Sequence, residues 1–132
     1  MWGIVFWGHL LPLFLFQGEP LSIVLETTAP ARGQWMVSLR TGAGTPIKEY
    51  VVPVSLAAGR QNVYLGDHAP GTYTLAVYLD ANKNTKLDKG ALGQPLEPYA
   101  FSNNARALFS APDVEDQRFK HPGKVQVLQV RN

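Results

Sequence analysis

The sequence predicts an all-β fold, a single antiparallel β-sandwich of about seven strands of the immunoglobulin or prealbumin type. The 132 residues include ten Pro and twelve Gly, which favours many turns and short elements. Between these turn signals stand short segments rich in Val, Leu, Ile, Thr and Tyr. In several of them apolar and polar residues alternate, so every second side chain lies on one face. A chain of this length forms one ordinary domain.

The alternation is clearest at residues 34–40, where Trp35, Val37 and Leu39 share one face and are expected in the core. Pro53, near the end of another segment, indicates a sheet edge or a strand terminus, because proline cannot donate to a ladder. The stretch from Gly90 to Asp113 contains several Pro and Gly and is predicted to be a long, ordered excursion. The predicted strands cover residues 21–26, 34–40, 47–54, 61–65, 70–79 and 124–130, with a short strand around 107–110.

The N-terminus has the pattern of an export signal. Residues 1–16 are apolar except for His9, and the polar residues 17–20 follow them. An apolar run that ends in a polar segment is typical of a signal peptide, although no Lys or Arg precedes this one. An uncleaved membrane anchor is the alternative, but the run is shorter than the roughly 20 residues that a membrane span needs.

We expect cleavage near Gly18, which divides the chain into a signal peptide over residues 1–18 and a β-sandwich domain over residues 19–132. The triplet at residues 29–31 (Ala-Pro-Ala) is a second candidate cleavage site, but a cut there removes the first strand. The expected location is therefore the periplasm or the medium, with no stable membrane span after cleavage.

Composition argues against several classes of function. The formal net charge is +2 and the Lys and Arg residues are scattered, which does not favour nucleic acid as a partner. The chain has no Cys, so disulfides, thiolate metal sites and Cys nucleophiles are excluded. Beyond the predicted signal the two histidines are His68 and His121, and their spacing is unlike that of zinc ligands.

The polar loop after the strand at residues 70–79 resembles a calcium-binding loop. Calcium prefers six to eight oxygen ligands, and alternating Asp and Asn on a looped backbone direct successive side chains to one centre. Positions one, three, five and nine of such a loop are matched by Asp80, Asn82, Asn84 and Asp88, and the carbonyl of Lys86 would fill position seven.

Two departures reduce the expected affinity of this loop for calcium. Thr85 stands where an EF-hand needs Gly, and Ala91 stands where it needs a bidentate Glu. With two carboxylates and no bidentate Glu, the expected dissociation constant for calcium is about 10⁻⁴–10⁻³ M. A missing ligand could come from Glu97 or from the acidic cluster at residues 113–116. The alternative is a hydrogen-bonded turn that binds no ion.

A second polar segment follows the long excursion and is a candidate ligand-binding loop. Loops carry binding residues more often than strands do, and Asn amides and an Arg suit hydroxyl, amide or anionic ligands. The alternative is that these side chains satisfy the backbone of their own loop. The candidate residues are Tyr99, Ser102, Asn103, Asn104 and Arg106.

We expect no enzyme and no catalytic residues. A hydrolase would need Ser102 or Ser110 as nucleophile with His68 or His121 as base, and no nucleophile-elbow pattern surrounds either Ser. Both His are expected at the surface, in or beside turns. Tyr73 follows Pro-Gly and is predicted to have a structural role, as the tyrosine that ties a strand corner to the backbone in sandwich folds.

Taken together, these motifs resemble a bacterial family catalogued as domain of unknown function 2141. The resemblance covers residues 21–130 and implies a small exported β-sandwich domain, but it implies no activity. The residues that carry it are Pro70-Gly71-Thr72-Tyr73, Ala76-Val77-Tyr78, Asp80-x-Asn82-x-Asn84 with Leu87-Asp88, and Phe101-Ser102-Asn103-Asn104-Ala105-Arg106, with a weaker match at Pro112, Glu115-Asp116 and Phe119.

The expected function is a non-catalytic exported module of the cell envelope that binds a protein or a glycan or has a structural role, with a possible weak calcium site at residues 80–88. The alternative is a small envelope ligand-binding protein or hydrolase that uses the loop at residues 99–106.

Overall fold

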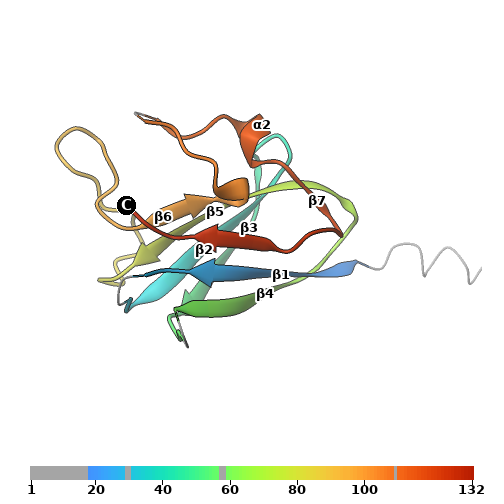
Figure 1. Ribbon diagram of the computed structural model, residues 1–132, viewed down its shortest axis with the longest axis horizontal. Coiled ribbons are helices and arrows are strands. Elements are labelled where there is room, and N and C mark those ends of the chain that lie inside the picture. The colour runs from blue at the N-terminus through green and yellow to red at the C-terminus, as the bar shows by residue number, and fades with distance from the viewer. Residues whose placement is uncertain (1–17, 29–30, 57–58, 109) are drawn as a thin grey trace, which may run out of the picture.

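The computed structural model describes residues 18–28, 31–56, 59–108 and 110–132. The predicted signal peptide lies outside the described residues except for Gly18, as do two residues of the second candidate cleavage site, so both remain predictions. The described chain forms two β-sheets that pack face to face (Figure 1). No helix in these ranges is long and apolar enough to cross a membrane.

The two sheets contain eight strands in the described residues. The smaller sheet has the order β4-β1-β8, and the larger has the order β3-β2-β5-β6, with β7 also paired to β5. A one-turn 3-10 helix, η1 (Ser102–Asn104), and a short helix, α2 (Val114–Gln117), lie between β6 and β7. The strands are β1 (Glu19–Glu26), β2 (Gln34–Thr41), β3 (Pro46–Pro53), β4 (Arg60–His68), β5 (Gly71–Asp80), β6 (Tyr99–Phe101), β7 (Phe119–His121) and β8 (Gln126–Gln129).

The predicted sandwich is confirmed, and one strand pair departs from the antiparallel rule. β8 runs parallel to β1, whereas every other pair is antiparallel. The reason is the crossover before β8. β7 ends at His121, whose ring Nε2 donates to the Glu19 carbonyl (2.9 Å), so the chain enters the smaller sheet beside the start of β1. It must then run in the same direction as β1.

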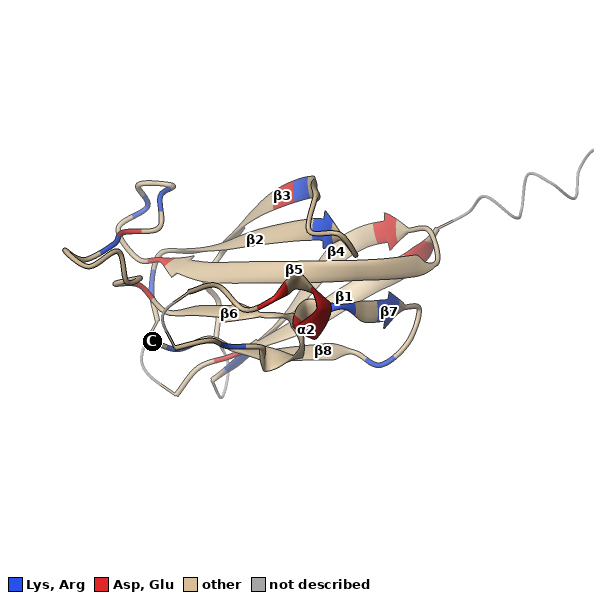
Figure 2. Cartoon of the chain, turned by 90° about the horizontal axis from the view of Figure 1, so that it is seen from above, with Lys and Arg blue, Asp and Glu red and all other residues tan. Residues whose placement is uncertain are grey.

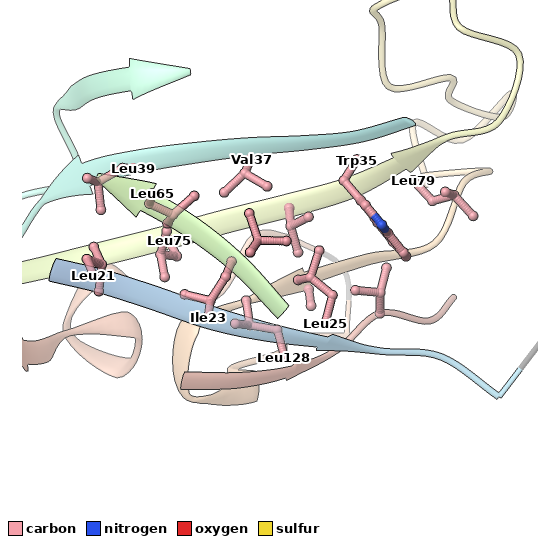
Figure 3. Close-up of a cluster of buried hydrophobic side chains, with 14 of the residues drawn as sticks. Leu21, Ile23, Leu25, Trp35, Val37, Leu39, Leu65, Leu75, Leu79 and Leu128 are labelled. Carbon is pink, nitrogen blue, oxygen red and sulfur yellow. The ribbon is translucent and has the colours of Figure 1, made fainter. Parts of the chain in front are cut away.

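The core lies between the sheets and follows the alternation in the sequence (Figure 3). Trp35, Val37 and Leu39 are all at most 1% exposed, which confirms the predicted inner face of β2. Each sheet contributes a row of aliphatic side chains whose outward neighbours are polar or half-buried. The buried apolar residues are Leu21, Ile23, Leu25, Trp35, Val37, Leu39, Val63, Leu65, Leu75, Val77, Leu79, Ala100, Phe119, Leu128 and Val130.

Side chains close the sandwich along its β3–β4 side. The Tyr50 hydroxyl donates to the Leu65 carbonyl (2.5 Å), and Gln61 Oε1 accepts from Trp35 Nε1 (2.8 Å). The Gln61 amide also donates to the Pro53 carbonyl (3.0 Å), where β3 ends. Pro53 is the last residue of an edge strand, as predicted.

The opposite side is closed by backbone. Tyr99 of β6 and Arg131, just beyond β8, exchange two hydrogen bonds (3.0 and 3.2 Å), which joins the two sheets. The loop between β5 and β6 and the C-terminus lie at one end of the sandwich, while β1 begins at the other end (Figure 1).

The sequence prediction is wrong between the end of β5 and β8. Of residues 107–110, those that the structure describes are not in a strand, while β6, η1, α2 and β7 were not predicted. β6 and β7 have three residues each, too few for alternation to be recognised. They are strands because they share the edge of β5 that faces away from β2, β7 pairing at Gly71–Tyr73 and β6 at residues 76–78.

Candidate functional site

Asp80, the last residue of β5, folds the following loop back onto the strand. Its side chain is fully buried. One carboxylate oxygen, Oδ2, accepts from Gln34 Nε2 (2.9 Å) and from the Thr85 N–H (2.8 Å), and the other accepts from the Asn84 N–H (3.1 Å). A buried carboxylate is tolerated because its lone pairs are satisfied by N–H donors.

These hydrogen bonds hold a backbone conformation that the loop would otherwise avoid. Lys83 and Thr85 have φ of 56° and 63°, in the left-handed region. That region is unfavourable for a β-branched residue such as Thr85. The bond from the Thr85 N–H to Asp80 stabilises it, so Asp80 defines the course of the loop.

Asn82, Asn84 and Asp88 contact one another. The side-chain amides of Asn82 and Asn84 each donate to a different oxygen of the Asp88 carboxylate, both at 2.9 Å. Their own oxygens accept backbone N–H groups, of Asn84 (3.2 Å) and of Lys86 (3.0 Å) respectively. Lys86 itself is exposed. The predicted calcium residues therefore gather in one loop, but most of their donors and acceptors are used within it.

Glu97 forms hydrogen bonds to both ends of the segment at residues 81–88. It is 8% exposed, and its two oxygens accept the N–H groups of Ala81 (3.0 Å) and Asp88 (3.1 Å). Within the described ranges no three His, Cys, Asp or Glu side chains are placed to hold a metal ion. Calcium can also use amide and carbonyl oxygens, so the calcium site stays a prediction.

The electrostatics of the loop favour an ionised Asp80. Burial raises the pKa of this carboxyl, but the hydrogen bonds from Gln34 and from the backbone of Thr85, Asn84 and Lys83 outweigh it and lower the pKa below its ordinary value. Burial raises the pKa of Tyr78, and the negative charge of Asp80 adds to this shift.

Ser102, in the second candidate loop, is fully buried, and its hydroxyl forms hydrogen bonds within the chain. Its hydroxyl donates to the Gln117 carbonyl (2.5 Å) and accepts the Leu75 N–H (2.9 Å). Leu75 lies between the two parts of β5 that pair with β6 and β7. The side chain of Ser102 thus takes the place of a strand partner at that point.

Asn103 and Asn104 connect η1 to both neighbouring segments. Both residues have positive φ, 60° and 53°, which Asn tolerates better than most residues. Asn103 Nδ2 donates to the Arg118 carbonyl (2.7 Å), and Asn103 also exchanges two hydrogen bonds with the Gln126 side chain (2.7 and 3.0 Å). Asn104 donates to the Val127 carbonyl (3.0 Å) and accepts the N–H of Gln129 (2.9 Å), as a strand beside β8 would.

Arg106 covers the junction between the sheets. Its guanidinium donates to the carbonyls of Tyr99 (2.6 Å) and Arg131 (2.7 Å) and lies 4.2 Å from the centre of the Tyr99 ring. Burial lowers the pKa of Arg106, and the charge of Arg131 lowers it further. All five candidate residues are brought together, and the hydrogen-bonding groups of four side chains are engaged with their own chain.

The family comparison covers both loops. The family described as "Uncharacterized protein conserved in bacteria (DUF2141)" matches residues 27–129, which is most of the chain. The chain belongs to this family. The resemblance inferred from the motifs is therefore confirmed. No curated protein and no solved structure matches the chain.

In this DUF2141 chain the histidines also serve the fold. His68 Nε2 lies 2.8 Å from the Leu65 carbonyl and 3.1 Å from the Tyr50 hydroxyl. His121 is 6% exposed, so its expected surface position is wrong, because it packs edge-on against Tyr73 (5.9 Å between ring centres). The Tyr73 hydroxyl donates to the Ala69 carbonyl (2.5 Å), four residues upstream, in the geometry of a tyrosine corner.

Sequence reasoning missed the glutamines that complete both loops. Gln34 binds Asp80, Gln126 binds Asn103, and the Gln117 carbonyl accepts from Ser102. Each partner is distant in sequence, and an isolated Gln at a strand end or in a short helix has no distinctive pattern. Only the pairing of strands brings them together.

Asp80→Asn is expected to reduce the free energy of unfolding by about 1.5–3 kcal/mol at pH 7, because an amide nitrogen would face N–H donors. The folded pKa of Asp80 is below its ordinary 3.8, so its stabilisation is complete above that value and is lost as the pH falls through the folded pKa. Urea unfolding between pH 2 and 7 should show the wild-type advantage shrinking in acid. The control is Asp113→Asn, because the Asp113 side chain forms no capping hydrogen bond to α2 and its replacement should leave the stability unchanged. Equal stability of Asp80→Asn and wild type at pH 7 would contradict this role.

Asn104→Gly is expected to cost about 1–2 kcal/mol, since it removes two hydrogen bonds to β8 and keeps the left-handed backbone accessible. Asn104→Ala should cost about 1 kcal/mol more, because alanine is strained at positive φ. Urea unfolding of both variants separates the side-chain and backbone effects, with the exposed Asn62→Ala as control. Two variants as stable as wild type would show that these bonds do not hold η1 to β8.

Calcium at 10 mM is expected to change the thermal midpoint by less than about 1 °C relative to chelator, because the loop oxygens already accept hydrogen bonds. A site of about 10⁻⁴ M would instead add about 2.7 kcal/mol and several degrees. Thermal unfolding of wild type, Asp80→Ala and Asp88→Ala distinguishes the two. A rise that either variant abolishes would establish the calcium site.

Proposed function

We propose that this chain is a non-catalytic β-sandwich module, exported to the bacterial cell envelope or the medium, that acts by binding another envelope component or by structural support. The observation that carries this proposal is the use of the polar side chains in both candidate loops. Asp80, Ser102, Asn103 and Asn104 direct their polar groups at the chain's own backbone and side chains. In such a module the polar side chains of both loops stabilise the fold, and a partner would contact other parts of the surface.

The alternative, a ligand-binding protein or hydrolase that uses residues 99–106, has less support. A nucleophilic Ser must be reachable by substrate and by a base. The Ser102 hydroxyl is buried and donates a hydrogen bond to the Gln117 carbonyl. Arg106 donates to two carbonyls instead of facing an open cavity. The calcium site predicted from the sequence at residues 80–88 is tested by the unfolding experiment above.

Export is tested by fractionation of bacteria that produce the chain with a C-terminal epitope. We expect the epitope in the periplasm or medium, on a product shorter than the full chain by about the length of the signal peptide. Deletion of residues 2–18 is the matched control and should leave the product in the cytoplasm. Full-length wild type retained in the cytoplasm would overturn the envelope proposal.

The non-catalytic part is tested separately. The purified protein should hydrolyse p-nitrophenyl esters at the same rate as Ser102→Ala, His68→Ala and His121→Ala variants that retain the β-sheet circular dichroism. Turnover that disappears when one of these histidines is replaced would overturn it.

A further inference from the structure

In the loop between β5 and β6 the acidic side chains are more buried than the basic ones. Two of its three acidic residues are buried, since Asp80 is fully buried and Glu97 is 8% exposed, while Asp88 is half-buried and accepts hydrogen bonds from two Asn side chains. The three basic residues of the loop are Lys83, Lys86 and Lys89, and all are exposed. None of them forms an ion pair within the part of the chain that the structure describes. The outward charge of the loop is therefore positive, although its formal charges cancel.

After these lysines the chain forms a turn at residues 90–96 that carries two exposed leucines. Leu92 is 93% exposed and Leu96 is 56% exposed. The turn is ordered by hydrogen bonds from the Gly90 N–H to the Gln94 carbonyl (2.8 Å) and from the Leu96 N–H to the Asp88 carbonyl (2.8 Å). Leu92 is thus held in solvent by a defined hairpin. Turns favour Gly, Asn, Asp, Pro or Ser, so a leucine at this position does nothing for the turn itself.

A third exposed leucine lies outside this loop. Leu108, in the segment after η1, is 91% exposed. The β5–β6 loop projects beyond one end of the sandwich in both views (Figures 1 and 2). In Figure 2 the blue lysine positions follow the outer part of the loop, beyond the end of the sheet. The exposed lysines therefore belong to the half of the loop that leads to the apolar turn, at one end of the molecule.

We propose that this end of the sandwich, with Leu92 and Leu96 at its tip and Lys83, Lys86 and Lys89 in the same loop, docks on an anionic lipid surface. Lysines near such a surface are attracted to acidic headgroups, and exposed aliphatic side chains gain by entering the headgroup–acyl boundary. A protein partner would need an apolar pocket with acidic residues around it, whereas an anionic bilayer offers acidic headgroups and an apolar layer beneath them over its whole surface. The inference rests on the proposed envelope function and names the partner of the module.

The test is co-sedimentation of residues 18–132, which contain every core residue, with phosphatidylglycerol vesicles and with phosphatidylcholine vesicles. Binding to the acidic vesicles is expected at about 20 mM salt and should weaken at about 500 mM, where charges are screened over a few ångströms. Phosphatidylcholine should bind at least tenfold less. In Leu92→Trp, the emission of the new indole should shift to the blue on binding, while buried Trp35 gives a constant background.

Two variants test the surface, and a third is the matched control. Both Lys83→Gln/Lys86→Gln/Lys89→Gln and Leu92→Ser/Leu96→Ser should bind at least tenfold more weakly. Lys120→Gln/Lys124→Gln/Val125→Ser, which changes exposed residues at the other end of the sandwich (Figure 2), should bind within twofold of wild type. The changed side chains are all exposed, so folding is expected to be retained, and circular dichroism checks it.

Three results would overturn the proposal. They are no binding of wild type to acidic vesicles at low salt, binding that both loop variants retain, and equally tight binding to soluble polyphosphate that Leu92→Ser/Leu96→Ser leaves unchanged. The last result would indicate a polyanion site instead of a lipid surface. The vesicle assay does not depend on export, and fractionation does not depend on the loop, so the two proposals can fail separately.

Discussion

The hydroxyl of Ser102 completes the central strand of the larger sheet. β5 pairs with β2 along its length, but its other edge is divided between β7 and β6, and the N–H of Leu75 lies between them. A buried N–H without an acceptor is costly, and Ser102 Oγ accepts it at 2.9 Å while donating to Gln117. Ser102 is also the first residue of η1 and directly follows β6, and its hydrogen bond to Gln117 reaches α2. Its contacts therefore position β6, η1 and α2 relative to β5.

Other polar residues of the family motifs also satisfy backbone groups of neighbouring segments. Asn104 pairs with the backbone of β8 as another strand would, and Arg106 covers the point where the sheets meet. Asp80 and Glu97 hold the preceding loop from inside. The N–H groups of the chain satisfy these buried carboxylates, so the lysines of that loop are not needed as their partners. The lysine side chains are exposed to solvent instead. The charge separation at this end of the molecule is thus a consequence of how the loop folds.

Several elements could be predicted because their information is local. β2 alternates cleanly, and Pro53 indicated an edge strand that the structure confirms. The tyrosine corner was also predicted, from Pro-Gly before Tyr73. β6 and β7 could not be predicted, since three residues have no recognisable period and become strands only beside β5. The parallel pairing of β8 likewise depends on where β7 ends, which no local pattern records.

The sequence by itself determined the all-β class, the inner face of the strands, the family and the residues of both polar loops. Periodicity and turn chemistry are properties of neighbouring residues, so they can be read along the chain. Only the tertiary structure decided what the polar residues do. Asn104 finds its partners at Val127 and Gln129, and Asp80 finds one at Gln34. A hydrogen bond depends on which groups folding brings within about 3 Å, and distance along the sequence does not contain that information.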